Sequence, residues 1–400
     1  MSDRHLPVRP NLVQLKHQAK DLLRDMKRER PEAKLADAQL ALARSYGIKS
    51  WPRLVLACRM TDAICRDDVK AVRELVTKHP PLLHEMARGT ESCNWGPPMS
   101  YAANLGRDRI IEMLHGLGAK DATHALGRAL LQGQIETARL LETLGARPPR
   151  GAAVGCAEAL NDRGMKYVLD YGGVLGDDRS PLAAVAMALE TYSRYPEGKH
   201  RCLELFAARG VELPDTAAMA IHRGRVDLLE QLLQRDPALL TTTLRYQEIY
   251  PPELGCHANA DQSLGLHGTP LVGATLLHMC VDYDEIEIAR WLLDRGLPVD
   301  AKAEVDEAGF GGHTALFCCV VSMAHLNGRQ KDASFARLLL DRGADVNARA
   351  SLRKRLTFHD DTSLHEYRDV TPLSWGQRFH AREFVSEAAM RVIAERGGHP

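Results

Sequence analysis

Apolar residues recur at helical spacing in many short segments of this chain. The segments Ile286–Gly296 (IEIARWLLDRG) and Ser334–Gly343 (SFARLLLDRG) both place apolar residues at i, i+3 and i+4, which marks one face of a helix. Both end in glycine, the residue that most readily takes the left-handed conformation closing a helix. The pattern therefore predicts short amphipathic helices. Weaker copies occupy Ile110–Asp121, Ile135–Arg147, Cys202–Leu213, Val226–Leu240 and Ala389–Gly398.

A second, shorter apolar run precedes most of these segments. Thr275, Thr314 and Thr371 stand directly before such runs, where a threonine side chain can accept a hydrogen bond from the first helical turn. Pro372 then fits the first helical position. A short helix, a tight turn, a longer helix, a glycine and a loop make one unit, which buries its apolar face only by stacking on its neighbours. Further first helices are expected within Gly96–Arg107, Thr123–Gln134 and Asp215–Val226.

These units resemble ankyrin repeats. Thr275–His278 (TLLH), Thr314–Phe317 (TALF) and Thr371–Ser374 (TPLS) are similar to the T-P-L-H opening of that family, and Leu338–Asn347 (LLLDRGADVN) is similar to its closing segment. The resemblance is strongest from Gly273 to Asn347. It implies an all-α solenoid of about eight or nine helix-turn-helix units.

The resemblance also assigns a structural part to His278. In the T-P-L-H position this histidine is expected to form a hydrogen bond to the neighbouring repeat, and Cys280 is expected in the buried side of the same helix. The acidic residues Asp282, Asp284 and Glu285 are expected in the turn that follows, where negative charge suits the start of the second helix.

The spacing of the units is irregular, which implies clipped loops in some repeats and insertions in others. We predict irregular repeats over residues 60–241, an insertion loop over residues 242–273, and repeats with further insertions over residues 274–400. A second insertion covers Leu352–Thr371. Because insertions in repeat arrays usually map to one face, we expect both insertions to project from the same edge.

Residues 1–59 differ from the rest and form a basic, Ala/Leu-rich segment with two or three predicted helices. Residues 1–60 hold 13 Lys/Arg and 6 Asp/Glu, whereas the whole chain holds 52 of each. The segment resembles the N-terminal helical cap of a group of bacterial ankyrin-repeat proteins, and a terminal repeat needs such a cap. A helix-turn-helix for DNA is the alternative, but Pro52 would lie inside its recognition helix, so nucleic acid is not the expected partner.

The two insertions contain the residues best suited to chemistry. Cys256, His257 and His267 are zinc-ligand types, but their spacing matches no paired zinc module. The second insertion holds a His/carboxylate cluster around His359, Asp360 and His365, without an H-E-x-x-H motif. We therefore expect no metal and no cofactor. The first insertion is expected to be a folded binding loop, with a solvated insertion as the alternative, and the second is expected to be a solvated polar loop. Gly309–Thr314 (GFGGHT) is expected to be the hairpin finger of a repeat, and no nucleotide-binding or hydrolase motif is present.

Composition fits a soluble, cytoplasmic protein. Nine cysteines without a C-x-x-C pair indicate reduced thiols, no apolar targeting segment is visible at the start, and no apolar run approaches the length of a membrane span. We predict a non-catalytic, monomeric scaffold that binds an unidentified protein partner through the concave face and finger loops. An enzyme or a small-ligand or metal-binding protein that uses the insertions is the alternative. The candidate contact residues are Trp95, Tyr101, Tyr250, His257, His267, Phe310, His313, His359, Asp360, His365 and Trp375.

Overall fold

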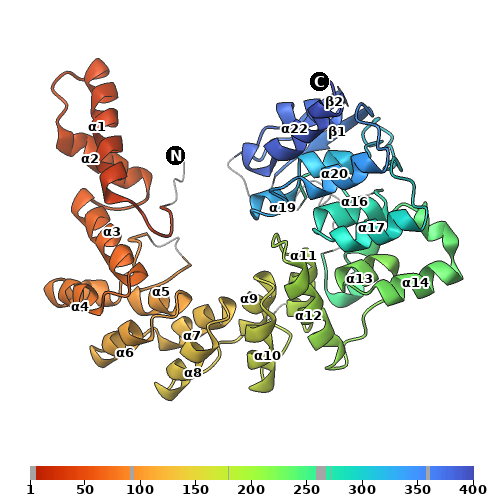
Figure 1. Cartoon of the computed structure of the whole chain (residues 1–400). Helices are drawn as coiled ribbons and strands as arrows, with labels where there is room; N and C mark the ends of the chain where they lie inside the picture. The colour runs from red at the N-terminus through yellow and green to blue at the C-terminus, as the bar shows by residue number, and fades with distance from the viewer. Residues whose placement is uncertain (1–5, 91–93, 179, 258–266, 272, 357–360) are drawn as a thin grey trace. The chain divides into compact units, whose positions relative to one another are not determined.

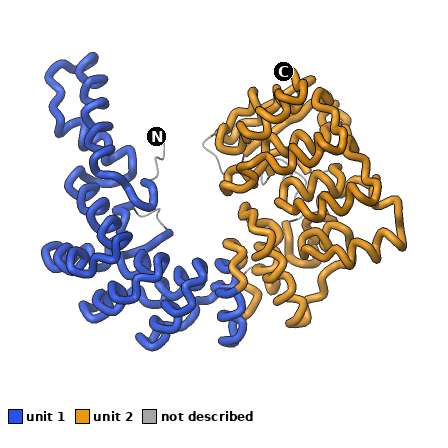
Figure 2. The backbone as a smooth tube through the Cα atoms, in the orientation of Figure 1, with its two compact units in different colours: residues 1–156, 163–173 blue, residues 157–162, 174–400 orange. Residues whose placement is uncertain are grey.

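The computed structural model describes residues 6–90, 94–178, 180–257, 267–271, 273–356 and 361–400 (Figure 1). These residues are mostly helical. They form two compact units, of which unit 1 holds residues 1–156 and 163–173 and unit 2 holds residues 157–162 and 174–400 (Figure 2). Within the described part of the chain, no helix is long and apolar enough to cross a membrane.

Unit 1 consists of helices joined by short turns. Its α-helices are α1 (Leu12–Glu29), α2 (Leu35–Ser45), α3 (Trp51–Cys65), α4 (Val69–Lys78), α5 (Pro98–Asn104), α6 (Asp108–Gly116), α7 (Ala122–Leu131), α8 (Ile135–Thr143), most of α9 (Ala152–Glu158) and α10 (Asp162–Asp170). A 3-10 turn, η1 (Pro80–Leu83), follows α4. Helix α5 packs on α7 and helix α4 packs on α6, so the first helices of successive pairs form one row and the second helices another (Figure 1).

The N-terminal helices form a small core of their own. Leu15 and Ala19 of α1 pack with Leu42 of α2 and Leu54 of α3. Helix α3 continues to Cys65 and also packs on α4 and α5. A boundary at residue 59 therefore falls inside a helix, because α3 serves both the N-terminal bundle and the first helix pair.

Unit 2 continues the helix pairs and adds a sheet. Its α-helices are α11 (Ala183–Glu190), α12 (Pro196–Ala207), α13 (Ala217–His222), α14 (Val226–Arg235), α15 (Tyr246–Ile249), α16 (Leu276–Asp282), α17 (Ile286–Asp294), α18 (Ala315–Val320), α19 (Met323–Leu326), α20 (Ser334–Asp341), α21 (Pro372–Arg378) and α22 (Glu387–Glu395). The 3-10 turns are η2 (Pro237–Leu240), η3 (Pro252–Leu254) and η5 (Arg382–Phe384), and the strands are β1 (Ala350–Lys354) and β2 (His365–Val370).

The helix pairs of unit 2 begin and end where the sequence predicts. Thr371 accepts a hydrogen bond from the Ser374 amide, and Pro372 occupies the first turn of α21. Gly296 and Gly343 close α17 and α20 with φ of 93° and 84°, a conformation that a Cβ would strain. First helices α13, α16, α18 and α21 stack in one row, and second helices α17, α20 and α22 stack in another.

The second insertion is not the all-polar loop that we expected, and unit 2 is not all-α. Strands β1 and β2 pair antiparallel, with Leu352 opposite Tyr367 and Lys354 opposite His365. The side chains of Leu352 and Lys354 are buried, and Arg353 between them is half-buried. This two-residue alternation is the strand signal, and three consecutive basic residues concealed it in the sequence. The finger at Gly311 joins the far edge of β1 through the carbonyl of Ser351, at 2.7 Å.

The first insertion also folds onto its unit. It contains α15 and η3, and its side chains Tyr246, Ile249, Leu254 and Leu271 are buried. Residues 258–266 and 357–360 lie outside the described residues. The expectation that both insertions project from one edge stays a prediction.

Candidate functional site: a buried polar cluster beneath the first insertion

The first helices of unit 2 are covered by other parts of the same unit. Every residue of α16 and of α18 is buried. Thr269 donates a hydrogen bond to the Val321 carbonyl at 2.8 Å, and the Trp375 indole donates to the Thr269 hydroxyl at 3.1 Å. Pro270 accepts a hydrogen bond from His313 at 2.9 Å. The insertion therefore lies across α18 and α21 and is attached to both.

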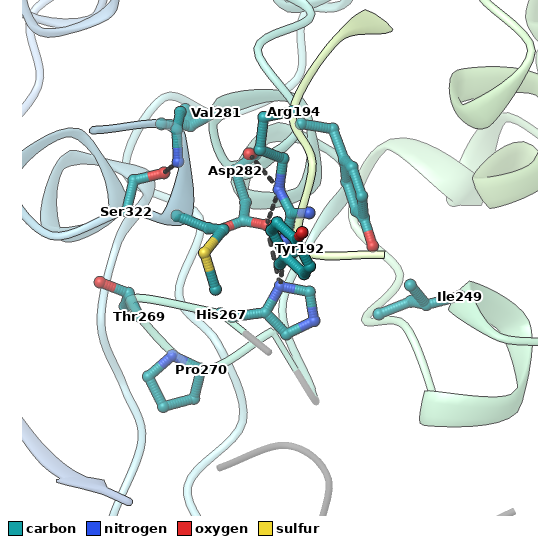
Figure 3. Close-up of polar contacts among 12 residues, drawn as sticks. Tyr192, Arg194, Ile249, His267, Thr269, Pro270, Val281, Asp282 and Ser322 are labelled. Carbon is teal, nitrogen blue, oxygen red and sulfur yellow. Dashed lines mark hydrogen bonds and ion pairs between the residues drawn. The ribbon is translucent and has the colours of Figure 1, made fainter. Parts of the chain in front are cut away.

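An ion pair lies at the centre of this covered region. Arg194, between α11 and α12, places its Nη2 atom 2.8 Å from Oδ2 of Asp282, at the end of α16 (Figure 3). Its Nε atom donates to the Asp282 carbonyl at 3.0 Å, and its Nη1 atom donates to the Thr191 carbonyl at 2.8 Å. Both side chains are at most 1% exposed. This pair joins segments that are 88 residues apart in the sequence.

The insertion completes the cluster through His267. The Nδ1 atom of His267 lies 2.8 Å from Oδ2 of Asp282, so it carries the proton, and Nε2 accepts from the Tyr250 hydroxyl at 2.8 Å. The Tyr250 hydroxyl lies 2.5 Å from the Tyr283 hydroxyl and accepts its hydrogen bond. The chain of hydrogen bonds runs from Tyr283 through Tyr250 and His267 to Asp282. Both nitrogens of His267 are thereby engaged.

Helices α12 and α13 add two more basic groups. The Lys199 ammonium lies 4.0 Å from the centre of the Tyr283 ring and 3.4 Å from Nδ1 of His222. The Nε2 atom of His222 donates to the Ile249 carbonyl in the insertion at 3.0 Å. Next to this group, His200 lies 2.6 Å from Glu285. The first insertion is thus attached to α13, α16, α18 and α21.

Burial sets the protonation states in this cluster. Burial opposes the charge of Asp282, but Arg194 and His267 outweigh it and hold the pKa of Asp282 below its usual range. Burial, and then the charge of Arg194, lowers the pKa of Lys199. Burial also lowers the pKa of His267, against the pull of Asp282. Burial therefore disfavours the charged forms of Lys199 and His267 beside the ion pair.

Lys354 is the least satisfied group near the cluster. Its side chain is 0% exposed, and its Nζ atom has no hydrogen-bond partner among the described residues. Burial lowers the pKa of Lys354 to about 7, although Asp282 acts in the opposite direction. An unpaired buried amine costs stability, since folding removes its water and offers no replacement.

A second polar group lies between the hairpin and α21. His365 stacks on His380 with ring centres 3.9 Å apart, and His365 Nε2 lies 2.8 Å from Asp361. His380 Nδ1 lies 2.7 Å from the hydroxyl of Tyr367, which packs edge-on against Trp375. Across the described residues, no group of three or more His, Cys, Asp and Glu side chains is placed to hold a metal ion.

The structure divides the predicted contact residues into three sets. Six are buried and contact the interior of their own unit, which corrects our expectation that they face a partner: Tyr101, Tyr250, His267, Phe310, His313 and Trp375. Trp95 and His365 are half-buried, and the His257 side chain is 75% exposed beside Glu190. His359 and Asp360 lie outside the described residues. These residues were chosen because they are aromatic, histidine or acidic, and residue type alone does not show whether a side chain points into the unit or towards solvent.

The predicted role of His278 agrees with the structure, whereas Asp282 and Glu285 have a role that was not predicted. His278 does bind the neighbouring repeat, because its Nε2 atom donates to the His313 carbonyl at 3.1 Å while Nδ1 contacts Thr275. Asp282 and Glu285 are buried and bind Arg194 and His200, so they do more than add charge to an exposed turn. Arg194, Lys199 and His222 were not predicted as site residues, because nothing in their local sequence patterns marks contacts with residues so distant along the chain.

Comparison with known proteins agrees with the resemblance where it is strongest. The ankyrin repeat family model matches residues 272–304 and 311–351. This confirms the prediction that the signature is clearest between Gly273 and Asn347. Among solved structures, the crystal structure of the human ASB11 ankyrin repeat domain is 16% identical, with a TM-score of 0.28 over 76% of this chain and 99% of that chain. Comparison with curated proteins finds no match.

Proposed function

We propose that this protein is a non-catalytic scaffold that binds another protein through surfaces of its helix repeats. Ankyrin repeats generally mediate protein–protein interaction. The observation that carries the proposal is the way the repeats are locked together, with His278 held by Thr275 on one side and by the His313 carbonyl on the other. Because such a repeat is already ordered, its surface loses little conformational freedom when a partner binds, and the entropic cost of association is lower.

One first helix of unit 1, α7, has an accessible face. On α7, Thr123 and His124 are exposed, and Gly127, Arg128 and Leu131 are half-buried. These positions repeat at three- and four-residue intervals and so share one face of the helix. In unit 2 the first helices α16 and α18 are entirely buried, so we assign no partner contact to them. We therefore assign partner contacts to α7, to the loops that carry Trp95 and His257, and to His365 at the start of β2.

The polar cluster of unit 2 supports a structural part better than a catalytic one. Its guanidinium, carboxylate and imidazole groups satisfy one another, and the two bonds to Asp282 join the Arg194 segment and the insertion to α16. A catalytic site instead holds polar groups ready for a substrate. The N-terminal alternative is also weaker, because seven of the fifteen residues of α3 are buried, which leaves little of that helix for a DNA groove.

Site-specific photocrosslinking tests the proposal. A photoreactive residue at Thr123 on α7 should capture one protein from an extract of the source cell, in near-equimolar yield. The matched control carries the same residue at Glu287 on the exposed side of α17, where we expect no specific product. Equal labelling at both positions, or no product at Thr123 and at the Trp95 loop, would contradict the proposed function.

A further inference from the structure

A small groove in unit 2 lies where the starts of α13 and α16 meet the end of α14. It has a volume of about 270 Å³ and is formed by the start of α13, the end of α14, η2, α15 and the first residue of α16. Leu232 and Leu239 line it and are only half-buried. Leu244 and Leu276 are buried beneath it. The groove is therefore an apolar surface that the chain leaves accessible.

The rim of this groove is acidic. Asp215, Asp236 and Glu248 line it, and Arg235 is the single basic lining residue. Arg235 lies 2.8 Å from Asp215, in a pair whose side chains are 60% and 58% exposed. Such exposed pairs contribute little to stability, so a ligand cation can compete for the carboxylate. The groove thus combines apolar side chains with an excess of negative charge.

The other two carboxylates are oriented by the backbone. Asp236 accepts a hydrogen bond from the Ala238 amide at 3.0 Å and has no ion-pair partner among the described residues. Glu248 accepts from the Arg245 amide at 2.7 Å. The side chain of Arg245 lies 3.5 Å from Glu248 and is 82% exposed, so it is easily displaced. Because backbone amides bind the carboxylates of Asp236 and Glu248, these groups are already oriented in the absence of a ligand.

We propose that this groove binds an extended protein segment that carries a lysine or arginine beside an aliphatic residue. The stem of a basic side chain packs on Leu232 and Leu239 while its charged end stays at the acidic rim, as long basic side chains do at apolar surfaces. A water molecule takes about 30 Å³ in the liquid, so the groove has room for a lysine side chain and part of an aliphatic neighbour. This inference rests on the proposed function and adds the chemistry of the partner.

The negative rim excludes the opposite class of ligand. Phosphates and acidic peptides would meet three carboxylates and one already paired guanidinium. A second copy of this chain is the other conceivable occupant, since its N-terminal 60 residues carry 13 Lys/Arg and 6 Asp/Glu. The two occupants differ in their dependence on protein concentration, which separates them experimentally.

The test uses the full chain with labelled leucine methyl groups and two short probe peptides. The peptides are acetyl-Gly-Leu-Lys-Leu-Gly-amide and the same peptide with Glu in place of Lys. The lysine peptide should shift the methyl signals of Leu232 and Leu239 and bind at least five times more tightly than the glutamate peptide. Binding should weaken between 50 and 300 mM salt, because its selectivity is electrostatic.

Isosteric variants locate the interaction. Asp236→Asn and Glu248→Gln keep their hydrogen bonds to the backbone and remove charge, so each should weaken the lysine peptide about two- to fivefold. Glu287→Gln on α17, which lies outside the groove, is the matched control and should change nothing. Equal binding of the two peptides, or unshifted Leu232 and Leu239 methyl signals, would overturn the inference. Sedimentation that shows rim-dependent self-association, with no peptide binding, would replace the proposed occupant by a second copy and overturn it as well.

The outcomes also distinguish this inference from the proposed function. If crosslinking at Thr123 captures a partner but the groove does not bind the lysine peptide, only the inference about the groove fails. If neither the Thr123 crosslink nor the peptide gives a specific result, the scaffold function itself fails.

Discussion

Helix α7 in unit 1 and helices α16 and α18 in unit 2 occupy the same position in their repeats but differ in exposure. Five positions on α7 are exposed or half-buried along one face, whereas every residue of α16 and α18 is buried. Helix α5 of unit 1 is covered as well, because all seven of its residues are buried and Tyr101 donates a hydrogen bond to the Val8 carbonyl of the N-terminal segment. The difference shows that other parts of a chain can cover the first helices of its repeats. In unit 2 the inserted segment does so, attached through His267 to the Asp282 of the buried ion pair.

The largest expected effect comes from removing one member of that ion pair. Arg194→Met leaves the Asp282 carboxylate buried and without its main partner, which should cost about 3–5 kcal/mol of unfolding free energy in unit 2. Arg128→Met on α7 is the control. Its Nε atom donates to Asn104, and the cost should be near 1 kcal/mol.

Hydrogen exchange measured separately for α16 and α7 checks this difference. If Arg194→Met and Arg128→Met reduce the protection of α16 and α7 equally, the ion pair does not explain the difference between these helices.

A buried leucine of the repeat framework should come next. Leu339→Ala on α20 removes a side chain that is 0% exposed, at an expected cost of about 2–5 kcal/mol. His257→Ala, in the exposed part of the insertion, should change stability by less than about 0.5 kcal/mol. Denaturant midpoints of the two variants provide the measurement. Similar losses would show that the tip of the insertion is as important to unit 2 as its core.

Lys354→Met should stabilise unit 2 by about 1–3 kcal/mol, because it replaces an unsatisfied buried amine with an apolar side chain of similar shape. The same change at the exposed Lys331 is the control and should have no effect. Thermal melting of both variants at pH 7 measures the difference. A loss of stability in Lys354→Met would mean that the amine has a partner that stabilises the fold.

The pKa of Lys354 also predicts how stability depends on pH. Its folded pKa is about 7, and an unfolded lysine titrates near 10.4. Between these values the unfolded chain binds the additional proton, so the stability of unit 2 should fall as pH decreases from about 10 to about 7. The Lys354→Met variant should show a weaker dependence over this range. An unchanged dependence would exclude Lys354 as its source.

Mild acid should destabilise the buried helices α16 and α18 of unit 2 more than helix α7 of unit 1. Burial, and then Lys199, lowers the pKa of His222, and burial lowers that of His267. A histidine in the unfolded chain titrates near pH 6.5. Below that pH the locally unfolded state of unit 2 therefore binds more protons than the folded state, and acid favours unfolding. Asp282, whose folded pKa is lowered, opposes opening until the pH falls below about 4.

Hydrogen exchange at pH 7.5 and 5.5, corrected for the intrinsic exchange rate, should therefore show a larger loss of protection in α16 and α18 than in α7. Substituting His267 by Gln, which keeps a polar side chain without a titrating group, should reduce that loss. A uniform response of all three helices would contradict a histidine-dependent cover.

The sequence by itself determined the repeated helix pairs. Periodic apolar residues, threonine caps and closing glycines are local signals, and the boundaries of α16, α17, α20 and α21 follow them closely. It also identified the part that His278 plays, because that residue belongs to a recognisable motif. The hairpin was not predicted because the alternating buried positions of β1 include Lys354, and the buried positions of β2, Tyr367 and Val370, do not alternate.

Only the tertiary structure decided which surface stays open and which polar residues meet. Arg194 reaches Asp282 across 88 residues, and His267 and Tyr250 enter the same cluster from an insertion that the sequence left open between a folded binding loop and a solvated one. Local patterns report which residues favour a helix or strand, since those preferences act over a few positions. Burial of a charge is decided instead by whether a distant partner arrives to offset its lost hydration, and that depends on how the whole chain packs.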